Sequence, residues 1–190
     1  MKTRLKIGGG IIVFAVFLLL GGYRYMELSV ILPWSIAVVS HELGHLISAK
    51  LCGAEVESFT LDVAGAKMSL SGKLISYGDE LFIAASGPIV NLAMAAFAFN
   101  AFPRYSAFSL ALGLLNLFPV SGFDGCRILQ SSLSLIFGAD FSAKASDIIS
   151  FATVVVLWIF AVYVLVKYKT GFSLFALTFL ILGKKAKKRG

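Results

Sequence analysis

The only two histidines of the chain, His41 and His45, lie four residues apart, with Glu42 between them. On an α-helix, residues four positions apart share one face, so both imidazoles can bind one metal ion. Zn²⁺ lowers the pKa of a bound water to about 7, and Glu42 is placed to accept its proton. The spacing therefore predicts zinc-assisted hydrolysis, with His41 and His45 as ligands and Glu42 as the general base.

A catalytic zinc normally has three protein ligands, and the third must here be a carboxylate or a cysteine. Asp124 is favoured, because it lies at the end of the fourth apolar segment. Its depth in the membrane is expected to be similar to that of the two histidines in the second segment. Alternatively, Asp124 could serve as an N-cap, or form an Asp-Gly turn, at the start of a helix that begins at Cys126. That role is compatible with metal binding. Cys126 itself is the weaker candidate, since a small buried cysteine is common without a metal.

The composition excludes several classes of protein. Hydrophobic residues make up 58% of the 190 residues and charged residues 14%, and the mean hydropathy is +0.90. Soluble chains have about 25% charged residues, so a soluble enzyme, a nucleic-acid-binding domain and a disordered tail are excluded. The two cysteines make no disulfide framework. The net charge of +7 reflects basic residues in the gaps between apolar runs, where membrane orientation places them.

The apolar runs predict an all-α polytopic membrane protein, with residues 1–190 forming a single membrane-embedded domain. We expect six transmembrane helices, at about 7–22, 28–50, 79–101, 106–123, 147–166 and 171–183. The first run could instead be a signal peptide, but no Ala-x-Ala site follows it, which favours a retained helix. With both termini in the cytoplasm, 13 of the 17 basic residues lie on the cytoplasmic side, as the positive-inside rule requires.

The connection at about 54–76 differs from the others, because it is too polar to span a membrane and too long for a tight turn. Apolar and polar residues alternate on both sides of Ala64-Gly65-Ala66, which predicts a membrane-associated β-hairpin between the second and third helices. The hairpin could simply rest on the membrane surface. Alternatively, its edge strand could accept an extended peptide by β-augmentation.

Ionisable residues at membrane depth argue against a chance occurrence of the histidine pair. The alternative is that the two imidazoles merely hold helices together, but such groups are costly in a membrane and mark function by default. A zinc carrier would also place histidine and aspartate in helices, but it does not need Glu42. A catalytically silent membrane scaffold would tolerate the loss of Glu42, whereas this chain retains it.

The motifs together resemble the site-2 protease family of intramembrane zinc metalloproteases. The resemblance is carried by His41-Glu42-Leu43-Gly44-His45, by Gly87-Pro88-Ile89-Val90-Asn91, and by Asn116 and Pro119 followed by Asp124-Gly125. The small core is similar to the branch that contains stage IV sporulation protein FB, without its CBS domain. Gly122 replaces the second proline of the family pattern, and Cys126 follows Asp124-Gly125 in place of a second glycine.

The resemblance implies a six-helix core in which His41, His45 and Asp124 bind Zn²⁺ and Glu42 is the general base. The implied partner is a membrane-bound protein substrate, such as a membrane-tethered transcription factor or regulator, cut near the cytoplasmic face of the cell membrane; no nucleic acid is expected to bind. Asn116 is a candidate for contact with the substrate carbonyl or the oxyanion, although an interhelical hydrogen bond is an equal alternative. Pro119 must break its helix, which is tolerable next to a water-filled pocket.

Overall fold

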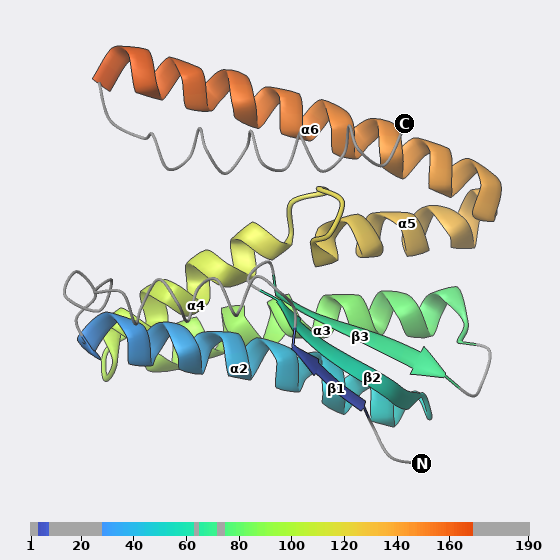
Figure 1. The fold of residues 1–190 in the computed structure, drawn as a ribbon, viewed down its shortest axis with the longest axis horizontal. Helices are drawn as coiled ribbons and strands as arrows, with labels where there is room; N and C mark the ends of the chain where they lie inside the picture. The colour runs from blue at the N-terminus through green and yellow to red at the C-terminus, as the bar shows by residue number, and fades with distance from the viewer. Residues whose placement is uncertain (1–3, 8–27, 63–64, 72–74, 169–190) are drawn as a thin grey trace.

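A computed structural model of the chain describes residues 4–7, 28–62, 65–71 and 75–168, and this part is mainly helical (Figure 1). Helix α3 lies at the centre, since it packs against α2, α4 and α5, while α6 packs against α5. The helices are α2 (Leu28–Leu51), α3 (Tyr77–Ala98), α4 (Pro103–Asn116), α5 (Asp124–Phe137) and α6 (Ala139–Tyr168).

Three of the described helices, α2, α3 and α6, are long and apolar enough to cross a membrane. Helices α2 and α3 begin and end within three residues of the predicted segments 28–50 and 79–101. The predicted helices at 7–22 and 171–183 lie outside the described residues. The mainly helical character and the apolar spans are therefore as predicted, whereas the number of crossings stays a prediction.

The predicted helix at 106–123 begins within three residues of the observed start but ends seven residues too late. Helix α4 begins at Pro103, because proline suits the first position of a helix, and ends at Asn116. Pro119 cannot continue the helix, since it lacks an N–H and restricts the residue before it. A loop at 117–123 follows, and the chain then forms α5, a helix that is absent from the predicted set. With 14 residues, α4 is shorter than the about 20 that a membrane crossing requires.

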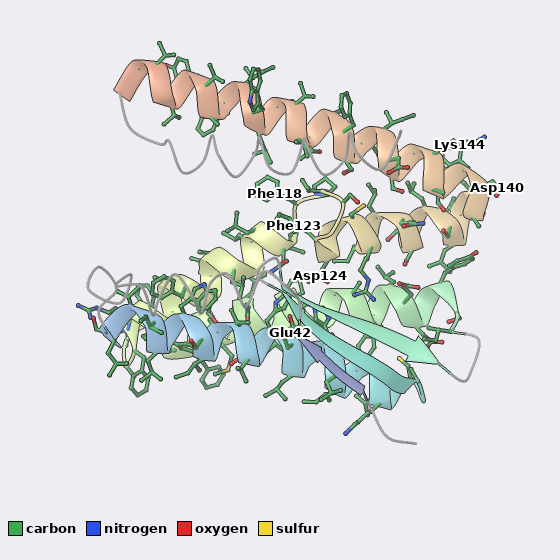
Figure 2. All side chains as sticks on the ribbon, viewed as in Figure 1. Glu42, Phe118, Phe123, Asp124, Asp140 and Lys144 are labelled. Carbon is green, nitrogen blue, oxygen red and sulfur yellow. The ribbon has the colours of Figure 1, made fainter. Side chains whose placement is uncertain are left out.

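The predicted helix at 147–166 is also wrong at its start, because α6 begins eight residues earlier. Gly138, with a φ of +84°, ends α5 and lets the chain reverse into α6 at once. The first turns of α6 are polar, with Asp140 and Lys144 at its exposed end (Figure 2). They stay helical because serines pair across the helix junction, with 2.6 Å between the Ser134 and Ser142 hydroxyls.

A three-stranded sheet lies beside α2, with its strands in the order β1-β2-β3. Strands β2 (Glu55–Asp62) and β3 (Gly65–Ser71) pair antiparallel within the interval 54–76, and their contact with a membrane stays a prediction. Strand β1 (Arg4–Ile7) pairs parallel with β2. The sequence analysis missed β1, because its four residues carry the basic pattern of a membrane-flanking segment and are too few to show alternation.

Small residues bring α2 and α3 together. A Cβ on Gly44 would lie 2.9 Å from the Ser86 carbonyl oxygen, so the two backbones are almost in contact. Ala49 and Ile83 form a buried cluster with Ala54 just beyond the end of α2. Such close approach is typical of helices that pack through dispersion contacts in lipid. The result is a fixed α2–α3 pair, and the histidines lie on its buried face.

Candidate metal centre

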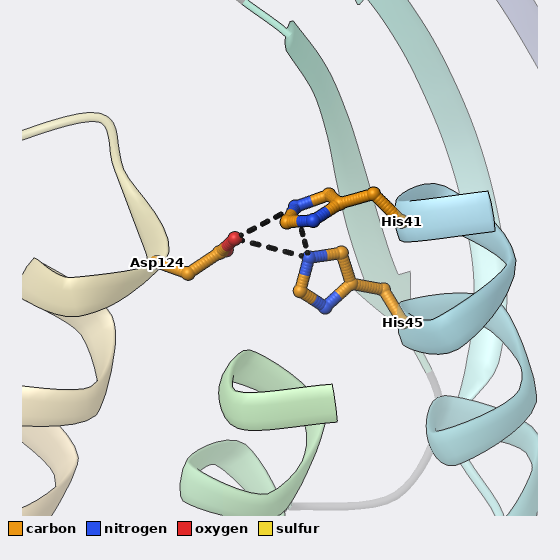
Figure 3. Close-up of side chains that lie close together, drawn as sticks. All are labelled: His41, His45 and Asp124. Carbon is orange, nitrogen blue, oxygen red and sulfur yellow. Dashed lines mark hydrogen bonds and ion pairs between the residues drawn. The ribbon is translucent and has the colours of Figure 1, made fainter. Parts of the chain in front are cut away.

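Three side chains from two distant parts of the chain meet in a buried group (Figure 3). Asp124 Oδ2 lies 2.9 Å from His41 Nε2 and 3.2 Å from His45 Nε2. The two Nε2 atoms lie 3.1 Å apart. The residues that the sequence singled out as metal ligands are therefore together, and each directs one ligand atom at a common point.

The histidine positions follow from the packing of α2 on α3. Both imidazoles lie on the buried face of α2, one helical turn apart, and both point toward α3. Gly87 of α3 leaves room for them, because a Cβ there would overlap His45 Nε2 and lie 2.9 Å from His41 Cε1. The glycine thus determines where the two rings lie.

A backbone carbonyl fixes the orientation of His45. Its Nδ1 lies 2.7 Å from the Ile83 oxygen, which can only accept, so Nδ1 carries the proton and donates. The Ser86 hydroxyl donates to the same oxygen at 2.7 Å. In a neutral imidazole the other nitrogen, Nε2, then has a free lone pair. Metal-binding histidines are typically held in this way.

The hydrogen bonds within the group cannot all be satisfied while Asp124 is ionised and both imidazoles are neutral. A neutral His45 with its proton on Nδ1 has no Nε2 hydrogen to donate to Asp124, so two lone pairs face each other. If both Nε2 atoms instead carried hydrogens, the His41–His45 contact would join two donors. A cation at the common point resolves both conflicts. Among the described residues, His41 Nδ1 is buried without a hydrogen-bond partner.

The donor set fits zinc. Two imidazole nitrogens and one carboxylate oxygen form a three-ligand set of the kind that leaves a fourth position open in catalytic zinc sites. Ligands at about 2.0 Å from a tetrahedral zinc lie about 3.3 Å from one another. The observed separations of 2.9, 3.1 and 3.2 Å are close to that value.

A short loop and the start of α5 hold Asp124. The Phe123 amide donates to the Val120 carbonyl at 2.9 Å, and the Ser121 amide donates to the Ser150 hydroxyl of α6 at 2.8 Å. A Cβ on Gly125 would overlap the Leu117 carbonyl, so the backbone of the loop packs directly against the first turn of α5. Residues from α4 to α6 thereby fix where Asp124 begins its helix.

The two imidazoles stabilise the ionised form of Asp124. Burial by itself raises the pKa of this carboxyl, but hydrogen bonds and charge interactions with His41 and His45, when their imidazoles are protonated, outweigh it. The net result is a pKa well below the usual range of an aspartate. Asp124 is therefore a carboxylate that is ready to bind a cation.

The other candidates from the sequence lie in different settings. Glu42 follows His41 on α2 and is half-buried, and Figure 2 labels it with Asp124 in the central part of the molecule. Asn116, the last residue of α4, donates from Nδ2 to the Leu112 carbonyl at 3.1 Å, so part of its side chain serves its own helix. Cys126 is not a member of the possible metal-binding group found among the described residues.

Two residues at the site were not assigned a role from the sequence. Gly87 was noticed only as part of a family motif, and its steric role depends on the α2–α3 distance. Arg127 was counted only among the basic residues that determine orientation. The signal that could have indicated its contact with Asp124 is the spacing of three residues along one helix.

Comparisons with known proteins agree with this arrangement. The profile of Peptidase family M50 matches residues 29–107, which include both histidines and Gly87. A zinc metalloprotease of Methanocaldococcus jannaschii is 33% identical over 116 residues, which cover 54% of this chain and 34% of the relative. Rip3 of Mycobacterium tuberculosis is 31% identical over 114 residues, covering 51% of this chain and 29% of the relative. The chain thus spans about a third of the length of these curated relatives.

The fold is similar to that of the site-2 protease from Methanocaldococcus jannaschii. The TM-score is 0.71, with 23% sequence identity, and the match covers 95% of this chain and 88% of the solved one. The apolar helices and the family profile together identify a membrane protein. The resemblance to the sporulation branch in particular stays a prediction. Residues 29–107 thus match Peptidase family M50, and the chain is similar in sequence to zinc metalloproteases and in fold to a site-2 protease.

Proposed function

We propose that this protein is an intramembrane zinc endopeptidase that cuts a membrane-associated protein substrate near the cytoplasmic face. The observation that carries the proposal is the convergence of His41, His45 and Asp124 on one point, with Glu42 beside them on α2. The match to Peptidase family M50 supports a zinc metalloprotease, and the apolar helices support a membrane location.

The residues of the site have separate roles in this proposal. His41, His45 and Asp124 hold Zn²⁺, which when bound acts as a Lewis acid that polarises a carbonyl and acidifies water. Glu42 accepts a proton from the attacking water and delivers it to the leaving amine. The water oxygen forms a bond to the carbonyl carbon, and the peptide C–N bond breaks. Asn116 is proposed to donate the second hydrogen of its Nδ2 atom to the substrate carbonyl, since the first is donated to the Leu112 carbonyl.

The surroundings suggest how the substrate reaches the site. A membrane-spanning helix must unwind before its peptide bond becomes accessible, since its carbonyls are otherwise engaged in helical hydrogen bonds. Among the described strands, β3 is an edge strand that pairs with β2 on one side, and its other side offers backbone groups that an unwound segment could join. We propose six crossings with both termini in the cytoplasm, the arrangement that the distribution of basic residues favours, with α4 and the loop at 117–123 together making the fourth crossing. A membrane-tethered transcription factor or regulator is the kind of substrate that this arrangement suits.

The test is the substitution Glu42→Gln in protein reconstituted into liposomes with a mixture of tagged single-span peptides. Mass spectrometry of released fragments should find cleavage by the wild type and a rate about 10²- to 10⁴-fold lower for the variant. Both proteins should retain zinc, because Glu42 is not one of the converging ligands. Equal cleavage by both, or cleavage that persists after zinc is removed, would contradict the proposal.

A further inference from the structure

Arg127 connects the candidate metal centre with the first turn of α3. Its Nη1 lies 3.6 Å from Asp124 Oδ1, one turn earlier on α5. Its Nη2 lies 3.4 Å from Glu80 Oε1 on α3. A single guanidinium therefore contacts two carboxylates on different helices through two different nitrogens.

The two oxygens of Asp124 have different surroundings. Oδ2 faces both histidine Nε2 atoms, whereas Oδ1 faces Arg127. A carboxylate can bind a metal through one oxygen or through both. Oδ1 forms an ion pair with the guanidinium at 3.6 Å, and Oδ2 is the oxygen directed at the common point. This arrangement keeps the ligand count at three and the fourth position open.

Glu80 completes the arrangement from the other side. An isolated guanidinium beside a metal centre would repel a dication, and Glu80 offsets its charge. Glu80 also holds the second edge of the planar group, so that rotation about the Arg127 side chain is restricted. The side chains of Arg127 and Glu80 are 40% and 46% exposed, whereas that of Asp124 is 11% exposed. The bridge thus runs from the surface into the buried site.

We propose that Arg127, held by Glu80, is a positioning residue that fixes Asp124 as a single-oxygen ligand of the metal. The inference rests on the proposed function, because it needs a metal at the three converging atoms. It makes a specific claim about geometry: the fork of the guanidinium is required, and a positive charge alone is insufficient.

The experiment compares Arg127→Gln, Arg127→Lys and Glu80→Gln with the wild type in detergent, after the native metal is removed and Co²⁺ is added. The visible absorption of Co²⁺ reports the number and geometry of its ligands, independently of activity. Competition with a chelator gives the relative affinity. Arg104→Gln, on the exposed first turn of α4, is the matched control for loss of an arginine.

We expect Arg127→Gln to bind Co²⁺ about tenfold more weakly, as is typical when a partner of a metal ligand is lost. Its absorption should weaken and shift, because the released Asp124 can offer both oxygens. Arg127→Lys should resemble Arg127→Gln, since one ammonium cannot hold both carboxylates in this geometry. Glu80→Gln should show a smaller change in the same direction, and Arg104→Gln should match the wild type. Because Glu80 is largely exposed, its variant tests the bridge even if Arg127→Gln misfolds.

The inference is overturned if Arg127→Lys matches the wild type, because charge alone would then suffice. It is also overturned if Arg127→Gln binds Co²⁺ as well as the wild type or more tightly, since the arginine would then only repel the metal. If the wild type binds no metal while folded, the proposed function itself fails. A wild type that binds metal, together with variants that bind it equally well, would overturn only the role of Arg127.

Discussion

The metal centre joins two regions that hold their ligands by different means. The histidine side, formed by α2 and α3, presents two rings from one rigid helix against a neighbour at almost backbone contact. The aspartate side, formed by residues 117–123, α5 and α6, presents a carboxylate from a loop that hydrogen bonds and one arginine hold in place. The first region depends on close packing, and the second depends on polar contacts. Substitutions in the two regions should therefore fail in different ways.

Among substitutions that leave the three ligands in place, the largest effect on metal binding is expected from Gly87→Ala on the histidine side. The new Cβ would overlap the ring of His45, and the ring must move because α3 is fixed by its neighbours. Zinc affinity should fall about 100-fold, the upper end of the range for disturbed surroundings of a ligand. Chelator competition measures this fall. The matched control is Gly78→Ala on the same helix, where the nearest atom, Ser76 Oγ, is 3.7 Å from the added Cβ.

A smaller loss of zinc, accompanied by a loss of stability, is expected from Gly125→Ala on the aspartate side. Its Cβ would overlap the backbone carbonyl of Leu117. A backbone carbonyl cannot move aside by rotation, whereas a side chain can. Overpacking of this kind costs about 1–3 kcal/mol. The midpoint of thermal unfolding in detergent should therefore fall in Gly125→Ala and change less in Gly87→Ala. If the two variants unfold alike, the contrast between the regions is wrong.

The smallest effect is expected from Ser150→Ala in α6. The Ser121 amide would lose its hydrogen-bond acceptor, which destabilises the loop by about 1 kcal/mol. Hydrogen exchange at Ser121 should become faster, and zinc should be removed slightly more easily. Ser150→Thr, which retains the hydroxyl, should restore both. Faster exchange without any change in zinc retention would separate the loop from the metal centre.

Local signals in the sequence were sufficient to predict much of the site. The pair His41 and His45 needs only helical spacing, and α2 and α3 are long apolar runs, so their bounds are close to those predicted. Asp124 was inferred by elimination and by depth along the chain, and the structure places it with the histidines. Its role as a ligand stays a prediction that metal analysis must test.

The remainder depends on contacts that hydropathy does not report. The segment 106–123 is mostly apolar, yet Pro119 breaks the helix, and the loop at 117–123 is stabilised by Gly125 and Ser150 from other elements. Helix α6 begins among polar residues because serines pair across the junction with α5. The roles of Gly87 and Arg127 likewise arise from distances between helices, which no single-sequence pattern encodes.

The most direct test of the central claim is the zinc content of the purified protein in detergent, measured by elemental analysis. The wild type and Glu42→Gln should each contain about one zinc per chain. His45→Ala and Asp124→Asn should each contain much less, because each removes one of the three converging ligand atoms. A folded wild type without zinc, or an Asp124→Asn variant that retains zinc as the wild type does, would contradict the three-ligand site.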